Sequence, residues 1–248
     1  MVTLSACGDA DRSPSPVPPA REPASAPAES PTAAESPTSP DPRRCKPSPG
    51  LSGSPTSIAE AVALLDVLPA PVTVACFVES LDRPLRIIAT ASPLSAQPAV
   101  DVASPRILIR NGTLTMAVVP AGMGKRLLEF GEDAGEGRTI KGEVELPLER
   151  SLRASAPYDR VLATEGKGTS CGVCHDDEAP APGLRPGLAS EILRPTPEFE
   201  VPLDDLRQAA ARCSSDDDDE RCALLTALFD HGPVLEAPAF VGGRICDH

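Results

Sequence analysis

The chain has 248 residues, and its 36 Asp and Glu against 23 Lys and Arg give a net charge of −13. This acidic balance argues against nucleic acid as a partner, because a phosphate backbone repels such a surface. No apolar run is long enough to cross a bilayer as a helix, so the sequence predicts no transmembrane span.

The chain begins with a segment that ends in Leu4-Ser5-Ala6-Cys7. This tetrapeptide resembles the lipobox of bacterial lipoproteins, where the signal is cleaved and the cysteine is acylated. The resemblance implies lipidation of Cys7 and a membrane anchor in the bacterial cell envelope, with the protein facing the periplasm or the exterior. A secretory signal has a charged start and about 7 to 15 apolar residues before its cleavage site, and neither is present before Cys7. We therefore interpret residues 1–7 as the remnant of a truncated lipoprotein signal.

Residues 8–57 consist mostly of Pro, Ser, Ala, Thr and Glu, with thirteen prolines between Pro14 and Pro55. Such a composition buries too little apolar surface to fold, so we expect a disordered stalk. In polyproline II geometry each residue spans roughly 3.1 Å, so the stalk could hold a domain on the order of 100 Å from its anchor.

Residues 58–163 are predicted to form a helix followed by a β domain. Ser57 as N-cap and Glu60 three residues later make a capping box before an apolar run, which Pro69 terminates. Six short apolar or alternating runs follow, separated by turn residues: residues 72–79, 85–91, 106–110, 114–119, 125–130 and 139–148. Asn111-Gly112 between two of these runs predicts a hairpin. We expect a small antiparallel β-sandwich or barrel.

Residues 164–248 are predicted to be a mostly helical, loop-rich segment, so the fold class is α+β. One helix is expected to begin after Pro202, and another to begin in the acidic run 216–220 and end before Gly232-Pro233. The acidic run lacks the alternating ligands and the glycine of a calcium loop. We interpret it as stabilising the helix macrodipole.

The C-terminal segment contains Cys171-Gly172-Val173-Cys174-His175. This CxxCH pattern resembles the attachment motif of c-type cytochromes. The resemblance implies haem c bound through thioethers at Cys171 and Cys174, with His175 as the proximal iron ligand. The function that it implies is an envelope-anchored electron carrier, with another redox protein or envelope component as partner.

The second iron ligand is open. Small cytochromes of this kind use a methionine after the motif, and no methionine follows Cys174. The remaining candidates are five-coordinate iron or a ligand from His231, His248, Met116 or Met123, of which we favour His231. The apolar wall of a haem crevice would come from Leu184, Leu188, Ile192, Leu193, Phe199, Leu224, Leu225 and Leu228.

The same motif has other interpretations. Cys171 and Cys174 could form a disulfide or a reducible dithiol in a non-enzymatic binding or scaffolding lipoprotein of the envelope, or they could contribute to a zinc site. Thioredoxin-like chemistry is disfavoured because the motif lies between a Gly-rich and a Pro-rich loop. Hydrolytic chemistry has no support either, since the sequence shows no nucleophile elbow. We therefore expect no independent enzymatic activity.

Eight cysteines indicate an oxidising compartment such as the periplasm or the cell surface. Spacing alone does not establish how cysteines pair. Our hypothesis pairs Cys213 with Cys222, which would join the two C-terminal helices, and Cys45 with Cys76, which would join the end of the stalk to the β domain. Cys246 would then be free or paired elsewhere.

Overall fold

The computed structural model describes residues 43–95, 97–163, 168–213, 219–238, 240 and 244–245. Cys7 and the lipobox, most of the expected stalk, the acidic residues 216–218, Cys246 and His248 lie outside the described residues. Within the described part, no helix is both long enough and apolar enough to span a membrane.

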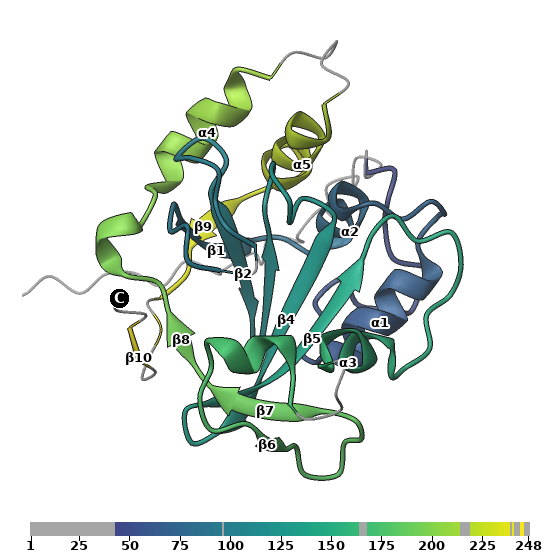
Figure 1. Cartoon of the computed structure of the whole chain (residues 1–248). Coiled ribbons are helices and arrows are strands. Elements are labelled where there is room, and N and C mark those ends of the chain that lie inside the picture. The colour runs from purple at the N-terminus through teal and green to yellow at the C-terminus, as the bar shows by residue number, and fades with distance from the viewer. Residues whose placement is uncertain are drawn as a thin grey trace, which may run out of the picture. The chain divides into compact units, whose positions relative to one another are not determined.

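Two helices open the described part of the chain, a run of consecutive strands follows, and further helices and short strands complete it (Figure 1). The α-helices are α1 (Ile58–Val67), α2 (Val74–Ser80), α3 (Ala156–Val161), α4 (Leu203–Ala211) and α5 (Glu220–Phe229). Two short 3₁₀ helices are η1 (Ser170–Val173) and η2 (Pro197–Phe199). The strands are β1 (Leu85–Thr90), β2 (Arg106–Asn111), β3 (Leu114–Val118), β4 (Leu127–Gly135), β5 (Arg138–Glu145), β6 (Ala179–Pro180), β7 (Leu188–Glu191), β8 (Leu193–Arg194), β9 (Val234–Glu236) and β10 (Arg244–Ile245).

Helix α1 begins where the capping signal predicts. The Ser57 side chain accepts a hydrogen bond from the Glu60 N–H at 3.2 Å, while the Glu60 carboxylate accepts from the Thr56 N–H at 2.7 Å. These bonds satisfy backbone donors that a helix start otherwise leaves unpaired. Ile58 and Leu65 on this helix are buried in the core.

The predicted strand at residues 72–79 is wrong, because this segment forms helix α2. The Thr73 side chain caps the helix by accepting from the Cys76 N–H at 3.1 Å. A short continuous apolar run fits a buried strand and a buried helix equally well, so periodicity alone does not separate them. Here α2 packs against α5 and buries Phe77 completely.

Replacing Thr73 with alanine tests this cap. We expect the free energy of unfolding to fall by about 1 kcal/mol, because the Cys76 N–H loses its partner at the start of the helix. Thr73→Ser keeps the hydroxyl and serves as the matched control, with a loss of less than about half that value. Urea denaturation of both variants measures the difference, and equal losses would show that the hydroxyl does not cap α2.

Eight strands form one open, mostly antiparallel sheet in the order β6-β7-β5-β4-β3-β2-β1-β9. The expected sandwich or barrel is therefore wrong: the strands do not close, and among the described residues the second sheet consists of β8 and β10. Helices cover the apolar face in place of a second sheet. The predicted hairpin is present as β2 and β3, and its turn has Gly112 at a φ of +56°, a conformation that favours glycine.

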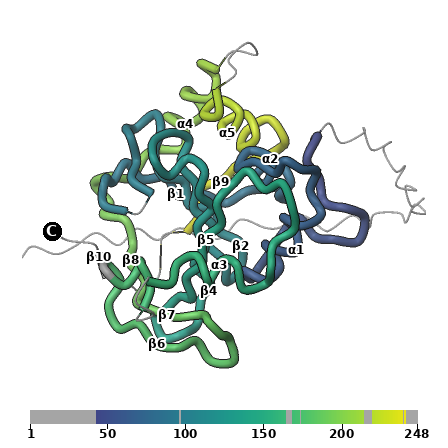
Figure 2. Tube along the Cα trace, turned by 45° about the vertical axis from the view of Figure 1, so that its right-hand side comes forward, coloured from purple at the N-terminus to yellow at the C-terminus, as the bar shows by residue number. Residues whose placement is uncertain are grey.

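Alternation along the strands divides the sheet into two faces. On the apolar face, Ile87, Ile109, Met116 and Phe130 pack with residues of α1, α2 and α5 in one buried cluster. Figure 2 shows α1 and α2 on one side of the sheet and β8 with β10 on the other. The opposite face, which carries the intervening residues of each strand, is called the polar face below.

Residues on both sides of position 163 contribute to the same sheet. Strands β6 and β7 extend it beyond β5, while β9 pairs in parallel with β1 at the other edge. The C-terminal segment was expected to be mostly helical and in fact supplies strands as well. Its contribution covers backbone edges of β5 and β1 that would otherwise lack hydrogen-bond partners.

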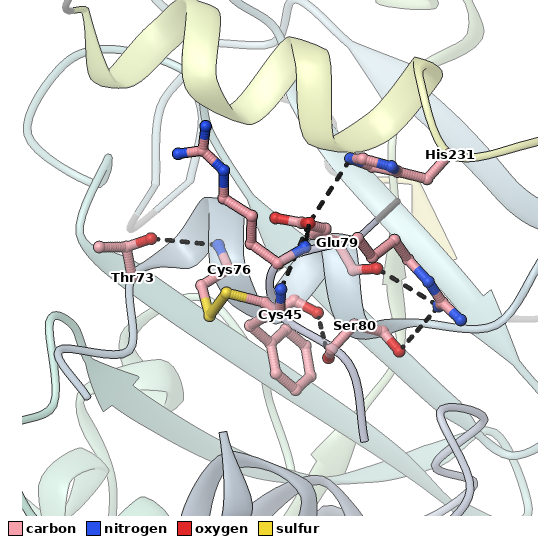
Figure 3. The surroundings of a disulfide bond; sticks show 9 residues. Cys45, Thr73, Cys76, Glu79, Ser80 and His231 are labelled. Carbon is pink, nitrogen blue, oxygen red and sulfur yellow. Dashed lines mark hydrogen bonds and ion pairs between the residues drawn. A yellow bond between two sulfur atoms is a disulfide. The ribbon is translucent and has the colours of Figure 1, made fainter. Parts of the chain in front are cut away.

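The structure contains both disulfides of the sequence hypothesis, Cys45–Cys76 and Cys213–Cys222. Around the first, the Glu79 carboxylate accepts from the backbone N–H groups of Arg44 and Cys45, the latter at 3.3 Å (Figure 3). The Arg43 guanidinium donates to carbonyls at the end of α2, including that of Leu81 at 3.1 Å. Residues 43–45 are therefore attached to α2 by one covalent link and several charged hydrogen bonds.

Candidate functional site

The polar face of the sheet carries charged side chains in the middle of its strands. Leu128 and Val144 are buried on the apolar face, so alternation directs Glu129 and Lys141 to the other side. Charged residues at the centre of half-buried strands are costly unless they are paired. Glu129 and Lys141 therefore need polar or charged partners on this face.

Arg106 on β2 and Glu129 on β4 form an ion pair across the intervening strand β3. Their side chains retain 24% and 15% of their exposure. Burial raises the pKa of Glu129 above its ordinary value, while the Arg106 guanidinium opposes that rise. The Arg106 Nε atom is buried and has no hydrogen-bond partner among the described residues.

Lys141 on β5 is another cation of this face. Its Nζ donates to the Thr139 hydroxyl on the same strand. Burial lowers the pKa of Lys141 to about 8, although Cys171, Glu129 and Glu178 favour its charged form. No carboxylate oxygen of the described residues lies within 4.0 Å of its amine.

The loop that contains the CxxCH motif lies next to these charges. Thr169 begins the short helix η1, and its own N–H and hydroxyl donate to the Glu178 carboxylate. A Cβ atom at Gly168 or Gly172 would lie 2.5 or 2.6 Å from the Glu178 Oε2 atom. Both positions therefore need glycine, because a larger residue would keep the Glu178 carboxylate from reaching Thr169 across the loop.

Cys171 and Cys174 are both free thiols in this loop. Cys174 is exposed, whereas Cys171 is partly buried. Burial raises the pKa of the Cys171 thiol, and the charge of Glu129 adds to the rise. A thiolate is the reactive form of cysteine, so Cys171 lacks the environment of an activated nucleophile.

His175 is held in a single tautomer by a backbone carbonyl. Its Nδ1 lies 2.8 Å from the Glu191 carbonyl oxygen. A carbonyl only accepts hydrogen bonds, so Nδ1 carries the proton and Nε2 keeps its lone pair. Burial lowers the pKa of His175 to about 4, and the Lys141 cation contributes to the shift. The imidazole is therefore neutral at pH 7 and can donate a lone pair.

The ligating atoms of the motif, but not its surroundings, match what covalent attachment of haem would require. Iron-ligating histidines commonly donate their second ring N–H to a carbonyl or a carboxylate, as His175 does to Glu191. Thioether formation needs two unpaired thiols, and Cys171 and Cys174 are unpaired. The charged side chains beside Cys171 are unlike the apolar wall that was expected to surround a porphyrin.

The last helix does not supply that wall. Leu224, Leu225 and Leu228 were expected to line a crevice, but they are buried in the core on the apolar side of the molecule. Leu188 and Leu193 lie closer to the motif in sequence, on β7 and β8.

The structure does not bring His231 to the motif. Its Nε2 lies 3.8 Å from the Glu79 carboxylate beside the Cys45–Cys76 disulfide (Figure 3). The chain after His231 enters β9 at the β1 edge, whereas the carbonyl that holds His175 belongs to β7, beyond β5. The intervening strands β4, β3 and β2 keep the two imidazoles apart.

The described residues contain no group of three or more His, Cys, Asp or Glu side chains arranged to hold a metal ion. Comparison of the chain with protein-family models, with curated proteins and with solved structures gives no match.

The sequence pattern predicted the CxxCH motif but not the charged side chains beside it. Glu129 and Lys141 were inside predicted strands, but nothing in the linear pattern distinguished them from solvated charges on a half-exposed sheet. Glu178 and Glu191 lay in segments that were expected to be loops. The one available signal was a charge in the middle of a predicted strand, and that signal is common on the solvent side of antiparallel sheets.

Proposed function

We propose that this protein is a c-type haem protein of the bacterial cell envelope that transfers electrons. Haem c would be bound through Cys171 and Cys174, with His175 as proximal ligand. The observation that carries the proposal is the tautomer of His175, whose Nε2 lone pair is left free beside two unpaired cysteines. The CxxCH spacing supports it independently.

The residues of the site have separable roles in this proposal. Haem supplies the one-electron redox couple. The Glu191 carbonyl orients the imidazole, and Glu178 holds the loop that carries both cysteines. Arg106 and Lys141 place positive charge near the motif, and Glu129 and Glu178 place negative charge there.

The location proposed for the protein is the cell envelope, with a lipid on Cys7. Attachment of residues 43–45 to α2 supports a tether that enters the folded part at this helix. The partner proposed is another redox protein or envelope component. The acidic charge of the chain disfavours nucleic acid as a partner.

Expression of the mature protein together with haem-attachment machinery tests the proposal. We expect a Soret band, haem-stained protein after denaturation, and a mass increase equal to one haem. Cys171→Ala/Cys174→Ala should abolish the stain, and His175→Ala should shift or reduce the Soret band. The matched control is Cys213→Ala/Cys222→Ala, which also removes two cysteines and should keep the haem. A colourless wild-type protein without the mass increase would refute the proposal.

A second candidate function is a binding or scaffolding lipoprotein in which Cys171 and Cys174 form a reducible pair. The charged surroundings of Cys171 favour this candidate, because they resemble a polar protein interior more than a porphyrin crevice. Alkylation of the two thiols with and without reductant tests it in haem-free protein. Reductant-dependent labelling of both cysteines supports the pair, and full labelling without reductant refutes it.

A further inference from the structure

The ladder between β1 and β2 stops before the two strands end. The last register pair at this end of the sheet is Ile87 with Ile109. Beyond that pair, Leu85 and Arg86 keep their partners on β9, and Arg110 keeps its partner on β3. The two strands therefore no longer pair with each other at this point.

A cavity of about 330 Å³ lies where the pairing stops. Two loops border it, residues 53–55 before α1 and residues 81–84 before β1. Its apolar lining includes Leu85, Ile109 and Met116, all of which are buried. The volume is at the lower end of the range for small-molecule sites, so the cavity suits a small ligand.

Charged and polar residues complete the lining, among them Ser54, Asp82, Arg83, Arg86 and Arg110. Three arginines against one aspartate give the cavity an excess of positive charge, although the whole chain has a net charge of −13. No carboxylate oxygen of the described residues lies within 4.0 Å of these three guanidinium groups. The Asp82 carboxylate accepts from the Ser54 hydroxyl at 3.0 Å. The cavity therefore attracts anions.

Arg83 is held in place by main-chain carbonyls. Its guanidinium donates to Leu81 just after α2, at 3.1 Å, and to Ala227 near the end of α5. Burial lowers the pKa of Arg83 to about 10, so the guanidinium stays charged at pH 7. Its Nε atom is buried and has no hydrogen-bond partner in the described part of the chain. Arg83 is thus a fixed positive charge beside the cavity, and its loss would also disturb two helix ends.

The other two arginines carry charges that nothing in the described residues neutralises. Arg86 is exposed, and its guanidinium has no ion-pair partner there. Arg110 donates to the Pro238 carbonyl at 2.7 Å and lies 4.7 Å from the centre of the Phe240 ring. Each arginine is adjacent in sequence to a member of the last register pair, so the two cations leave from neighbouring strands. Like charges in such positions are unfavourable, and a bound anion relieves the repulsion.

We propose that this cavity binds a small carboxylic acid in its anionic form. The carboxylate accepts from Arg86 and Arg110, because a guanidinium matches the planar carboxylate geometry. The remainder of the ligand packs against the apolar lining. Asp82 adds a negative charge to the same cavity and disfavours a dianion such as phosphate. The site lies at β1 and β2, whereas His175 is bonded to β7 beyond β5, so the inference does not depend on the proposed function.

Isothermal titration calorimetry of the full chain with benzoate tests the proposal. We expect saturable binding in the wild type. Arg86→Gln should weaken it by about tenfold or more, because a charged hydrogen-bond donor is lost. Arg86 is exposed and anchors no other side chain, so the urea midpoint of this variant should equal that of the wild type. The matched control is Arg153→Gln, an arginine that is 82% exposed and pairs with Asp159, which should keep the wild-type affinity.

Benzamide and inorganic phosphate separate the two contributions to binding. Benzamide keeps the ring without the charge, and phosphate keeps the charge without the ring. Affinities for both that are about tenfold or more below that of benzoate support the proposal. Absence of saturable benzoate binding, equal benzoate affinity in Arg86→Gln and the wild type, or binding of benzamide or phosphate as tight as that of benzoate overturns it.

Discussion

Replacing Arg106 with leucine is expected to lower the free energy of unfolding by about 2 to 4 kcal/mol at pH 7, because it leaves the Glu129 carboxylate partly buried without its ion-pair partner. Lys141 remains nearby but lies more than 4.0 Å from that carboxylate. The matched control is Arg126→Leu, whose side chain is 57% exposed and pairs with Glu220 at the surface. Its loss should stay below about 1 kcal/mol.

The deficit of Arg106→Leu should depend on pH. Burial already raises the pKa of Glu129, and loss of the guanidinium raises it further. A carboxyl group with a raised pKa stabilises the fold below its unfolded pKa, near about 4.3, and that contribution is lost as the pH rises through the folded value. The deficit is therefore largest at pH 7 and shrinks toward pH 4.5.

Urea denaturation at the two pH values measures this effect. Arg106→Leu/Glu129→Leu should recover most of the lost stability at pH 7, because the unpaired charge is gone. A deficit that is the same at both pH values, and that the double variant does not relieve, would show that packing of the arginine stem accounts for the loss.

Removing the Cys45–Cys76 disulfide is expected to cost about 3 to 4 kcal/mol, since it closes a loop with a sequence separation of 31 residues. Cys45→Ala/Cys76→Ala avoids placing a hydroxyl at Cys76, which is 6% exposed. The same variant should loosen residues 43–45 from α2 (Figure 3), because only the hydrogen bonds of Glu79 and Arg43 then hold a short, partly exposed segment.

Chemical denaturation and limited proteolysis measure the two effects. Cys213→Ala/Cys222→Ala is the matched control: its shorter separation of 9 residues predicts a loss of about 2 to 3 kcal/mol. Trypsin should cut after Arg44 faster in the Cys45–Cys76 variant than in the control, since Arg44 is exposed and is not followed by proline. Equal unfolding losses and equal cleavage rates would show that the link does not constrain this end of the folded part.

If haem is attached at Cys171 and Cys174, the polar face becomes the functional side of the molecule. The apolar face then mainly stabilises the fold, because its side chains are buried against α1, α2 and α5. This division explains why charges are tolerated in the middle of β4 and β5.

Local signals in the sequence predicted the elements that depend on neighbouring residues. The capping box at Ser57 predicted α1, the turn at Gly112 predicted the β2–β3 hairpin, and Pro202 predicted the start of α4. Both disulfides match the sequence hypothesis, although spacing alone did not establish the pairing. For the capping box, the turn and Pro202, the deciding interactions lie within a few residues of the chain.

Only the tertiary structure decided the remaining features. Residues 74–80 are apolar enough for a strand or a helix, and packing against α5 selected the helix. The sheet is open, and it is extended at its two edges by β6, β7 and β9, which lie far along the chain from β5 and β1. The site around Lys141 combines side chains from β2, β4, β5 and the loop after residue 168. Burial and charge pairing of that kind arise only when distant segments meet, so no local pattern could reveal them.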